Sequence, residues 1–297
     1  MPLQTQFCGD NYFTEKIYFV YITKRVDVYE ILRYNGGMKY YVVADPHGYY
    51  TYLEQTLRVK GFFEDKEPHK LIICGDLFDR GGEAKKMQEF VLDLLRKDQI
   101  ILIRGNHEDL AIEFVKNAWR YIQWGLKSSH HYSNGTVDTF CQLIDMNLYD
   151  MAIFPSKAVD LMENTPYIKN IIPSMVDYYE TPNYIFVHGW IPCKASGFGG
   201  QVSNFEYDKK WRKASPKEFE LARWYNGMLA VSQGVIEPNK TIVCGHWHCS
   251  YGHSKLEHKG CEFGENADFS PYIGKGIIAL DACTIESRKI NCIIIND

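Results

Sequence analysis

Five short apolar runs in this chain each end at a residue of a type that binds metals. The runs KYYVVA, KLIICG, IILIRG, NYIFV and KTIVCG lead directly into Asp45, Asp76, Asn106, His188 and His246. A short apolar run bounded by Gly or Pro predicts a buried strand. Because ligands of open α/β sheets bind outside the carboxyl ends of the strands, we expect these five residues to meet at one rim.

The segments between the first strands have helical spacing. Residues 50–60, 83–97 and 108–124 are predicted helices, and the second of these carries apolar side chains at positions 87, 90, 91, 94 and 95. Strands that alternate with helices predict a largely parallel sheet with right-handed crossovers.

The rest of the chain lacks this repeated unit. The segment from about residue 125 to residue 180 contains several short helical patterns. These patterns predict a helical insertion that flanks the site. Residues 191–235 are predicted to be irregular and then helical, and SGFGG within them has the composition of a mobile loop. The tail from residue 274 predicts two strands around a turn.

The first 37 residues do not fit the pattern that follows them. They are rich in Tyr and charge, and they end in Asn35-Gly36-Gly37, which favours a turn or linker. We expect residues 1–37 to be an N-terminal extension and residues 38–297 to be one domain. A hairpin added to the edge of the sheet is the alternative for the extension.

Composition excludes several classes of protein. The 297 residues are 45% hydrophobic and 24% charged, which is ordinary for a globular protein, and the net charge of −4 without a basic run argues against nucleic acid as a partner. No apolar stretch approaches the roughly 18 residues of a membrane span. No signal peptide opens the sequence, so we expect no membrane association and a cytoplasmic location.

Cysteine usage agrees with a reducing compartment. Nine Cys without a CxxC pair do not form the pattern of a disulfide framework. Cys74 and Cys244 precede glycines at strand ends. We expect them to be small buried residues, with a metal or redox role as the alternative.

Two motifs carry carboxylates. In Asp45-Pro46-His47-Gly48, Asp and His follow a strand directly and can face one crevice. In GDLFDRGG, Asp76 can bridge two metals through its two oxygens, whereas Asp79 is too far along to join it and can orient a neighbouring group. Arg80 offers a planar fork that suits phosphate oxygens. A structural salt-bridge loop is the alternative for this motif alone.

Three motifs carry the remaining ligand types. Asn106 offers an amide oxygen, and His107 beside it lies at a predicted helix start, where the helix dipole lowers its pKa and a nearby carboxylate would raise it. A general acid requires the protonated form. His188 ends a strand, and a turn at Gly245 could let both His246 and His248 enter the site. The other histidines are expected to be ordinary: His69, His130, His131, His253 and His258.

The order of these motifs resembles that of the calcineurin-like metallophosphoesterase superfamily: DxHG, GDxxDRGG, RGNHE, HG after a strand, and GHxH. GDLFDRGG and LIRGNHE are similar to its phosphoprotein phosphatase branch, which includes serine/threonine phosphatases and bis(nucleosyl)-tetraphosphate hydrolases. The resemblance extends from Met38 to about Asp281. It implies a four-layer α/β/β/α sandwich of two mixed sheets, with metals at one rim.

The resemblance also implies roles for individual residues. The first metal would bind Asp45, His47, Asp76 and His248, and the second would bind Asp76, Asn106, His188 and His246. His107 would protonate the leaving oxygen while hydrogen-bonded to Asp79, and Arg80 would clamp the phosphoryl oxygens. A second phosphate-binding Arg is usual, and Arg223 is our candidate, with an ordinary helix-surface charge as the alternative.

The implied reaction is hydrolysis of a phosphomonoester by a hydroxide that bridges two divalent transition metals, with Mn favoured over Fe, Zn or Co. The substrate would be a phosphoprotein, a nucleotide or a small phosphoester. Our first expectation is an enzyme of serine/threonine phosphatase type, and the second is a nucleotidase or dinucleoside polyphosphate hydrolase. A catalytically silent metal-binding scaffold is a more remote alternative.

The chain departs from the family pattern at three positions. Ala44 replaces the usual Gly and Pro46 a common aliphatic residue, and neither change removes a ligand. Eukaryotic protein phosphatases generally lack a histidine at the position of His248. This departure puts protein substrates in doubt.

Overall fold

The computed structural model describes residues 37–198 and 201–297, and Met38–Asp297 form one compact unit. The predicted extension lies outside the described residues apart from Gly37, and so do Gly199 and Gly200 of the predicted mobile loop. The first half of the unit contains the elements β1 (Lys39–Val43), α1 (Tyr50–Lys60), β2 (His69–Cys74), α2 (Ala84–Arg96), β3 (Ile100–Ile103), α3 (Asn106–Lys116), α4 (Ala118–Trp124), α5 (His130–Asn134), α6 (Thr136–Ile144), α7 (Leu148–Ile153) and α8 (Pro155–Glu163).

The second half is richer in strands. It contains α9 (Ile172–Ser174), β4 (Tyr179–Glu180), β5 (Tyr184–Phe186), β6 (Lys194–Phe198), β7 (Gln201–Glu206), α10 (Pro216–Ala222), α11 (Gly227–Ser232), β8 (Thr241–Cys244), β9 (Tyr272–Gly274), β10 (Ile277–Ala279), α12 (Thr284–Ser287) and β11 (Cys292–Asn296). Four short turns of 3-10 or π helix join these elements: η2 (Leu126–Ser128), η3 (Tyr167–Ile171), η4 (Trp211–Lys213) and η5 (Gly252–Leu256).

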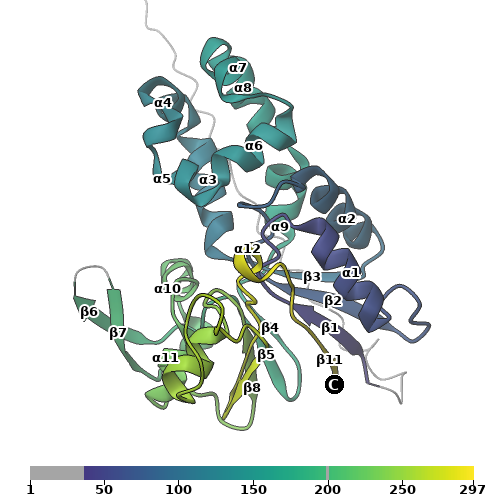
Figure 1. The fold of residues 1–297 in the computed structure, drawn as a ribbon, viewed down its shortest axis with the longest axis vertical. Helices are drawn as coiled ribbons and strands as arrows, with labels where there is room; N and C mark the ends of the chain where they lie inside the picture. The colour runs from purple at the N-terminus through teal and green to yellow at the C-terminus, as the bar shows by residue number, and fades with distance from the viewer. Residues whose placement is uncertain (1–36, 199–200) are drawn as a thin grey trace, which may run out of the picture. The chain divides into compact units, whose positions relative to one another are not determined.

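Two mixed sheets form the centre of the unit (Figure 1). The first has the order β11-β1-β2-β3, in which β1, β2 and β3 are parallel and β11 is antiparallel to β1. The second has the order β4-β5-β8-β10-β9, in which the three central strands are parallel and the two outer ones antiparallel. The predicted α/β fold with two mixed sheets is confirmed.

Each sheet is buried on both faces. Along β1, Tyr41 packs among residues of the helices, whereas Val42 belongs to a cluster that also contains Val243 of β8. Along β8, Val243 faces the first sheet and Cys244 packs in the cluster that includes α10 and α11. Burial on both faces requires apolar residues at successive positions, which explains why these strands appear as continuous apolar runs.

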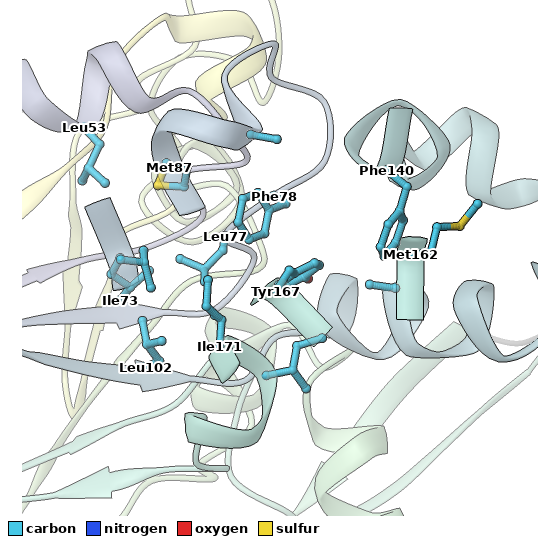
Figure 2. Close-up of a cluster of buried hydrophobic side chains, with 14 of the residues drawn as sticks. Leu53, Ile73, Leu77, Phe78, Met87, Leu102, Phe140, Met162, Tyr167 and Ile171 are labelled. Carbon is cyan, nitrogen blue, oxygen red and sulfur yellow. The ribbon is translucent and has the colours of Figure 1, made fainter. Parts of the chain in front are cut away.

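The helical segment shares a core with the first sheet. Figure 2 shows Ile73 and Leu102 of the strands in one cluster with Phe140 of α6 and Met162 of α8. Phe78, in the loop after β2, lies between them, and its ring centroid is 4.4 Å from that of Tyr167. This packing anchors the loop that carries Asp76, Asp79 and Arg80 against the helices.

Three predictions of secondary structure were wrong in part. The helix expected at 108–124 begins at Asn106 and is divided at Asn117, whose side chain donates to the carbonyl and the carboxylate of Glu113. Such local side-chain bonds compete with helix continuation. Residues 191–235 also contain the antiparallel hairpin of β6 and β7. In the tail, β10 and β11 belong to different sheets, and α12 lies between them.

Two further expectations concern the chain as a whole. Every cysteine in the described part is free, and Cys74 and Cys244 are buried. Among the helices of residues 37–198 and 201–297, none has the length and apolar character needed to cross a bilayer.

Candidate metal centre

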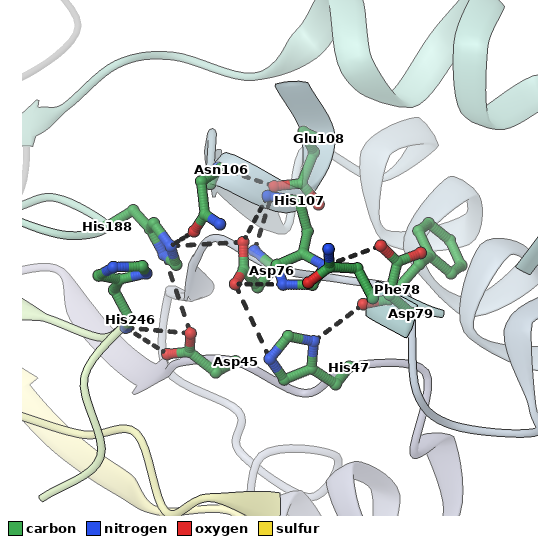
Figure 3. A network of polar contacts seen from close by, with 12 residues as sticks. Asp45, His47, Asp76, Phe78, Asp79, Asn106, His107, Glu108, His188 and His246 are labelled. Atoms are coloured by element: carbon green, nitrogen blue, oxygen red, sulfur yellow. Dashed lines mark hydrogen bonds and ion pairs between the residues drawn. The ribbon is translucent and has the colours of Figure 1, made fainter. Parts of the chain in front are cut away.

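The five strand-end residues lie together (Figure 3). The imidazole Nε2 of His188 is 2.8 Å from Asn106 Oδ1 and 3.3 Å from Asp76 Oδ1. The Asp45 carboxylate accepts the backbone N–H of His246 at 3.0 Å, and the rings of His188 and His246 are 5.0 Å apart. The two sheets therefore deliver oxygen and nitrogen donors to one place, although their residues are up to 201 positions apart in sequence.

The backbone of the site is in an unusual conformation. Positive φ angles of 46° to 73° occur at site residues in the loops after β1, β2 and β8: Asp45, His47, Asp76, Asp79, Arg80 and His246. Non-glycine residues rarely adopt this conformation, and it concentrates at functional sites. It turns the chain sharply after the strand, so that successive side chains face the same crevice.

The glycines that precede Asn106 and His246 are required by close packing. A Cβ on Gly105 would lie 2.1 Å from Asp76 Oδ1, and one on Gly245 would lie 1.9 Å from Asp45 Oδ2. In each case the carboxylate of another loop rests on the glycine. The repeated pattern of Gly before a polar strand-end residue thus has a steric cause.

Hydrogen bonds set the tautomers of two histidines. Nδ1–H of His47 donates to the Phe78 carbonyl at 3.0 Å, and Nδ1–H of His188 donates to the Cys74 carbonyl at 2.8 Å. In the neutral ring, Nε2 is then an unprotonated acceptor. In His47 this atom is 3.8 Å from Asp76 Oδ2. Metal-binding histidines are usually oriented by such a bond on the other ring nitrogen.

The charges of the site complement a cation. Burial lowers the pKa of His47 and of His246 to about 3, so both imidazoles are neutral and available as ligands. Burial alone would raise the pKa of Asp76, but His188 and the neighbouring histidines hold it below its usual value. An ionised carboxylate therefore lies among imidazole donors, of which His47 and His246 are neutral, and carboxylate and imidazole together suit a divalent first-row metal.

These donors form two overlapping groups. The ligand atoms of His47, Asp76 and His107 lie within 4.8 Å of one another, and so do those of Asp76, His188 and His246. Asp76 is common to both. The residues present thus fit a pair of cations that share one carboxylate, with His107 on the side of His47.

Asp281 joins this site and was missed by the sequence analysis. It is buried, it lines the same cavity, and burial raises its pKa. Burial and the charge of Asp281 also raise the pKa of Asp45. The signal was available, because Asp281 follows the apolar run GIIAL as the other acids follow theirs.

His107, a member of the first donor group, forms a buried pair with Asp79. Nδ1–H of His107 donates to Asp79 Oδ2 at 2.7 Å, while its Nε2 is 3.9 Å from Asp76 Oδ2. Burial lowers the pKa of His107, but Asp76 and Asp79 outweigh it and raise the pKa to about 9. At neutral pH this imidazole carries a proton that it can donate.

Two threonines of α6 hold the Asp79 carboxylate. Thr136 donates to Oδ2 at 2.8 Å, and Thr139 donates to Oδ1 at 2.9 Å. The Thr139 hydroxyl also accepts the backbone N–H of Asp79 at 3.0 Å. The helical segment thus takes part in the site through this carboxylate, a contact for which the sequence holds no local signal.

We expect Thr139→Val to lower the free energy of unfolding by about 1–3 kcal/mol, because the buried N–H and carboxylate of Asp79 each lose a partner. Urea unfolding measures the change. The control is Thr241→Val in β8, a half-buried residue whose hydroxyl makes no hydrogen bond within the described chain. Equal stability of the two variants would contradict the role given to Thr139.

Glu108 organises the loops beneath the site. It is fully buried, and its Oε2 accepts the backbone N–H groups of Gly105 at 2.7 Å and Asp76 at 3.1 Å. Its Oε1 accepts the N–H of Leu77 at 3.0 Å. Burial raises the pKa of Glu108 to about 7, and these donors oppose that effect. The carboxylate joins the loop after β2 to the start of α3.

Glu108→Ala should destabilise the protein by about 3 kcal/mol or more, because three buried N–H groups lose their acceptor. Glu108→Gln should have a smaller effect, since its amide oxygen can still accept the two bonds made at Oε2. Thermal unfolding of both variants measures which of them is less stable. If the Gln variant proved as unstable as the Ala variant, the loss of hydrogen-bond acceptors would not explain the effect of Glu108→Ala.

The site opens into a cavity of about 360 Å³. Arg80 is exposed and lines it, and so do the aromatic side chains of Trp224, Trp247 and Phe263. His248 also lines the cavity, but its Nε2 is 3.1 Å from Glu262 Oε1, and it belongs to neither group of metal donors. The predicted fourth ligand therefore lies beside the centre and contacts an acid.

Arg223 does not line the cavity. Its guanidinium donates to Asp109 at 2.6 Å and to Asp177 at 2.5 Å, and the residue is buried. Two carboxylates neutralise its charge away from the site, so the structure gives it an internal structural position. Its neighbour Trp224 is the residue of this segment that faces the cavity.

Comparison with known proteins agrees with this geometry. The model of the calcineurin-like phosphoesterase family matches residues 38–267, and the chain belongs to this family. The chain is 32% identical over 87 residues to serine/threonine-protein phosphatase 1 of Salmonella typhimurium, covering 29% of this chain and 38% of that protein. It is 38% identical over 71 residues to the symmetrical bis(5′-nucleosyl)-tetraphosphatase of Buchnera aphidicola, covering 24% of each chain.

These alignments thus cover well under two thirds of either relative. Among solved structures, a cold-active protein tyrosine phosphatase aligns with 88% of this chain and 74% of its own, with a TM-score of 0.50 and 17% identity. At that identity, the likeness concerns the fold.

Proposed function

We propose that this protein is a metal-dependent phosphomonoesterase similar to the serine/threonine phosphatases. The observation that carries the proposal is the position of Asp76, which is shared by two groups of possible metal donors, one of which includes His107 of the His107–Asp79 pair. Two divalent cations bound there would lower the pKa of a water molecule and neutralise charge on the phosphoryl oxygens. The family and the named phosphatase relative support the same reaction class.

The proposed ligands are those that the family resemblance implies. Asp45, His47, Asp76 and His248 would hold one cation, and Asp76, Asn106, His188 and His246 the other. His248 is the weakest member of this set, because Glu262 competes for its Nε2. Mixed nitrogen and oxygen donors accept Mn, Fe, Zn or Co, and we favour Mn.

Three further residues have proposed roles in the reaction. His107 donates the proton on Nε2 to the leaving oxygen, because its Nδ1–H is held by Asp79 at 2.7 Å. The carboxylate of Asp79 fixes the orientation of the ring and favours its charged form. Arg80, exposed at the cavity, binds phosphoryl oxygens through its planar fork.

A nucleotidase or dinucleoside polyphosphate hydrolase is the second candidate. Large exposed aromatic side chains line the cavity: Trp224 is 48% exposed and Phe263 is 58% exposed. Such rings can stack on a nucleobase, a contact worth about 1–3 kcal/mol per base. One relative carries the name of a bis(5′-nucleosyl)-tetraphosphatase.

A panel of substrates with Mn²⁺ tests the proposal. A phosphopeptide, an aryl phosphate, its diester and a dinucleoside tetraphosphate are compared for the parent protein and for Asp76→Asn. We expect the parent to prefer the monoesters, and the variant to be inactive toward all of them. A preference for the tetraphosphate would favour the second candidate, and hydrolysis of nothing would favour a catalytically silent scaffold.

Trp224→Ala separates the two candidates further. If a base stacks on this ring, KM for the dinucleotide should rise by about 5-fold or more, while KM for the phosphopeptide should change less. Trp119→Ala is the matched control, because Trp119 is similarly exposed (46%) and does not line the cavity. An equal change for both substrates would argue against a base at this position.

A further inference from the structure

A second set of metal-binding side chains lies away from the cavity, in the helical segment. Glu113 of α3 and the adjacent His130 and His131 of α5 have ligand atoms within 4.8 Å of one another. Glu113 Oε2 contacts His131 Nε2 directly and is 3.9 Å from His130 Nε2. None of the three lines the cavity of the metal centre. From the sequence, both histidines were expected to be ordinary.

The Glu113 carboxylate is held by its other oxygen. The amide of Asn117 donates to Oε1 at 2.9 Å, and the Tyr121 hydroxyl donates to the same atom at 3.0 Å, with a longer contact of 3.3 Å to Oε2. Oε2 is therefore the oxygen that faces both imidazoles. Partners that fix a carboxylate in this way are typical of metal ligands.

The two histidines approach the same carboxylate with their rings close together and tilted. Their ring centroids are 3.9 Å apart, with an angle of 39° between the planes. The ring of His131 is fully buried. Its Nδ1 is buried without a hydrogen-bond partner in the described part of the chain. The contact with Glu113 therefore satisfies only one of the two ring nitrogens of His131.

We propose that Glu113, His130 and His131 form a separate divalent-cation site that prefers zinc. Two imidazoles and one carboxylate, with water as the fourth ligand, make a common tetrahedral zinc environment. The side chains of Glu113 and His130 are 42% and 55% exposed, so a cation and its water can reach the site from solvent. The buried His131 supplies the fixed ligand.

A cation at this position would join two parts of the chain that shape the catalytic pair. Glu113 lies on the helix that begins with Asn106 and His107. The helix of His130 and His131 leads through Gly135 to Thr136, which donates to Asp79. The site is therefore structural: it would hold α5 on α3 and thereby keep Thr136 in reach of Asp79.

Metal content measures the proposal directly. Purified full-length protein is saturated with zinc and dialysed, and bound metal is counted by mass spectrometry. We expect about three zinc ions per chain for the parent and for the control His258→Ala, whose histidine is exposed and belongs to none of the groups of possible metal donors. His130→Ala and Glu113→Gln should each hold about one fewer. Because the His130 side chain is 55% exposed, its replacement by Ala should leave the fold intact.

Asp76→Asn keeps this inference separate from the proposed function. In that background about one zinc ion should remain, should raise Tm, and should be lost on adding His130→Ala. Cobalt bound to the Asp76→Asn protein should give the visible absorption of a tetrahedral ion. If His130→Ala and Glu113→Gln hold as many ions as the parent, the proposal is wrong even if the enzyme is active. If the parent holds only one ion and His130→Ala removes it, the proposed dinuclear centre is wrong and the proposed site at Glu113, His130 and His131 is supported.

Discussion

Asp76→Asn should lower the turnover of an aryl phosphate by more than about a hundredfold, a loss at least of the order expected for removing a general acid. Asp76 contributes to both groups of metal donors, so the substitution removes charge from the two together. Asn has the same shape and tolerates the left-handed conformation of this position, where φ is 54°. The effect therefore arises from charge and ligation, and metal content should fall in parallel.

The matched control for this variant is Asp98→Asn. Asp98 also has a left-handed backbone, with φ of 53°, but its side chain is 89% exposed and pairs only with Lys70 within the described residues. Steady-state kinetics and metal analysis of both variants are compared with the parent. Near-parental turnover for Asp76→Asn would remove the basis for a shared carboxylate.

His107→Asn should reduce turnover of an alkyl phosphate by more than about a hundredfold, because the leaving alkoxide then receives no proton. An aryl phosphate with an acidic phenol should lose less, since its leaving group needs little protonation. Metal content should stay near that of the parent if His107 acts as an acid. The dependence on the leaving group distinguishes a proton donor from a metal ligand.

His258→Asn serves as the control for this second variant, since that histidine is exposed, belongs to no group of possible metal donors and does not line the cavity. Rates are measured with a series of phosphomonoesters whose leaving groups span a range of pKa. Equal losses across the series, together with loss of metal, would show that His107 is a ligand. The proximity of His107 to His47 and Asp76 makes this alternative a concrete one.

The positions of the principal site residues were predictable because their signals are local. A buried parallel strand needs an apolar run, and a polar residue directly after that run must lie at the carboxyl end of the sheet. Asp76 and His188 belong to different sheets, yet each obeys this rule. The helices at 50–60 and 84–96 were predictable for a similar reason, since their apolar spacing lies within one segment.

What escaped prediction depends on contacts between distant segments. The bonds from Thr136 and Thr139 to Asp79 cross 57 and 60 positions, and nothing near either threonine indicates them. Arg223 was expected at the phosphate, but Asp109 and Asp177 bind its charge, and only the folded chain brings these acids to it. Such pairings require a tertiary structure.

The backbone amide of Asp79 donates to the hydroxyl of Thr139, so its rate of hydrogen exchange measures whether α6 is packed against the loop after β2. That amide has its partner on another segment, so its protection from deuterium depends on α6 remaining docked. Any truncation that shortens residues 136–144 should expose it to solvent while the strands remain protected. Shortening these helices would therefore also loosen the loop that carries Asp79.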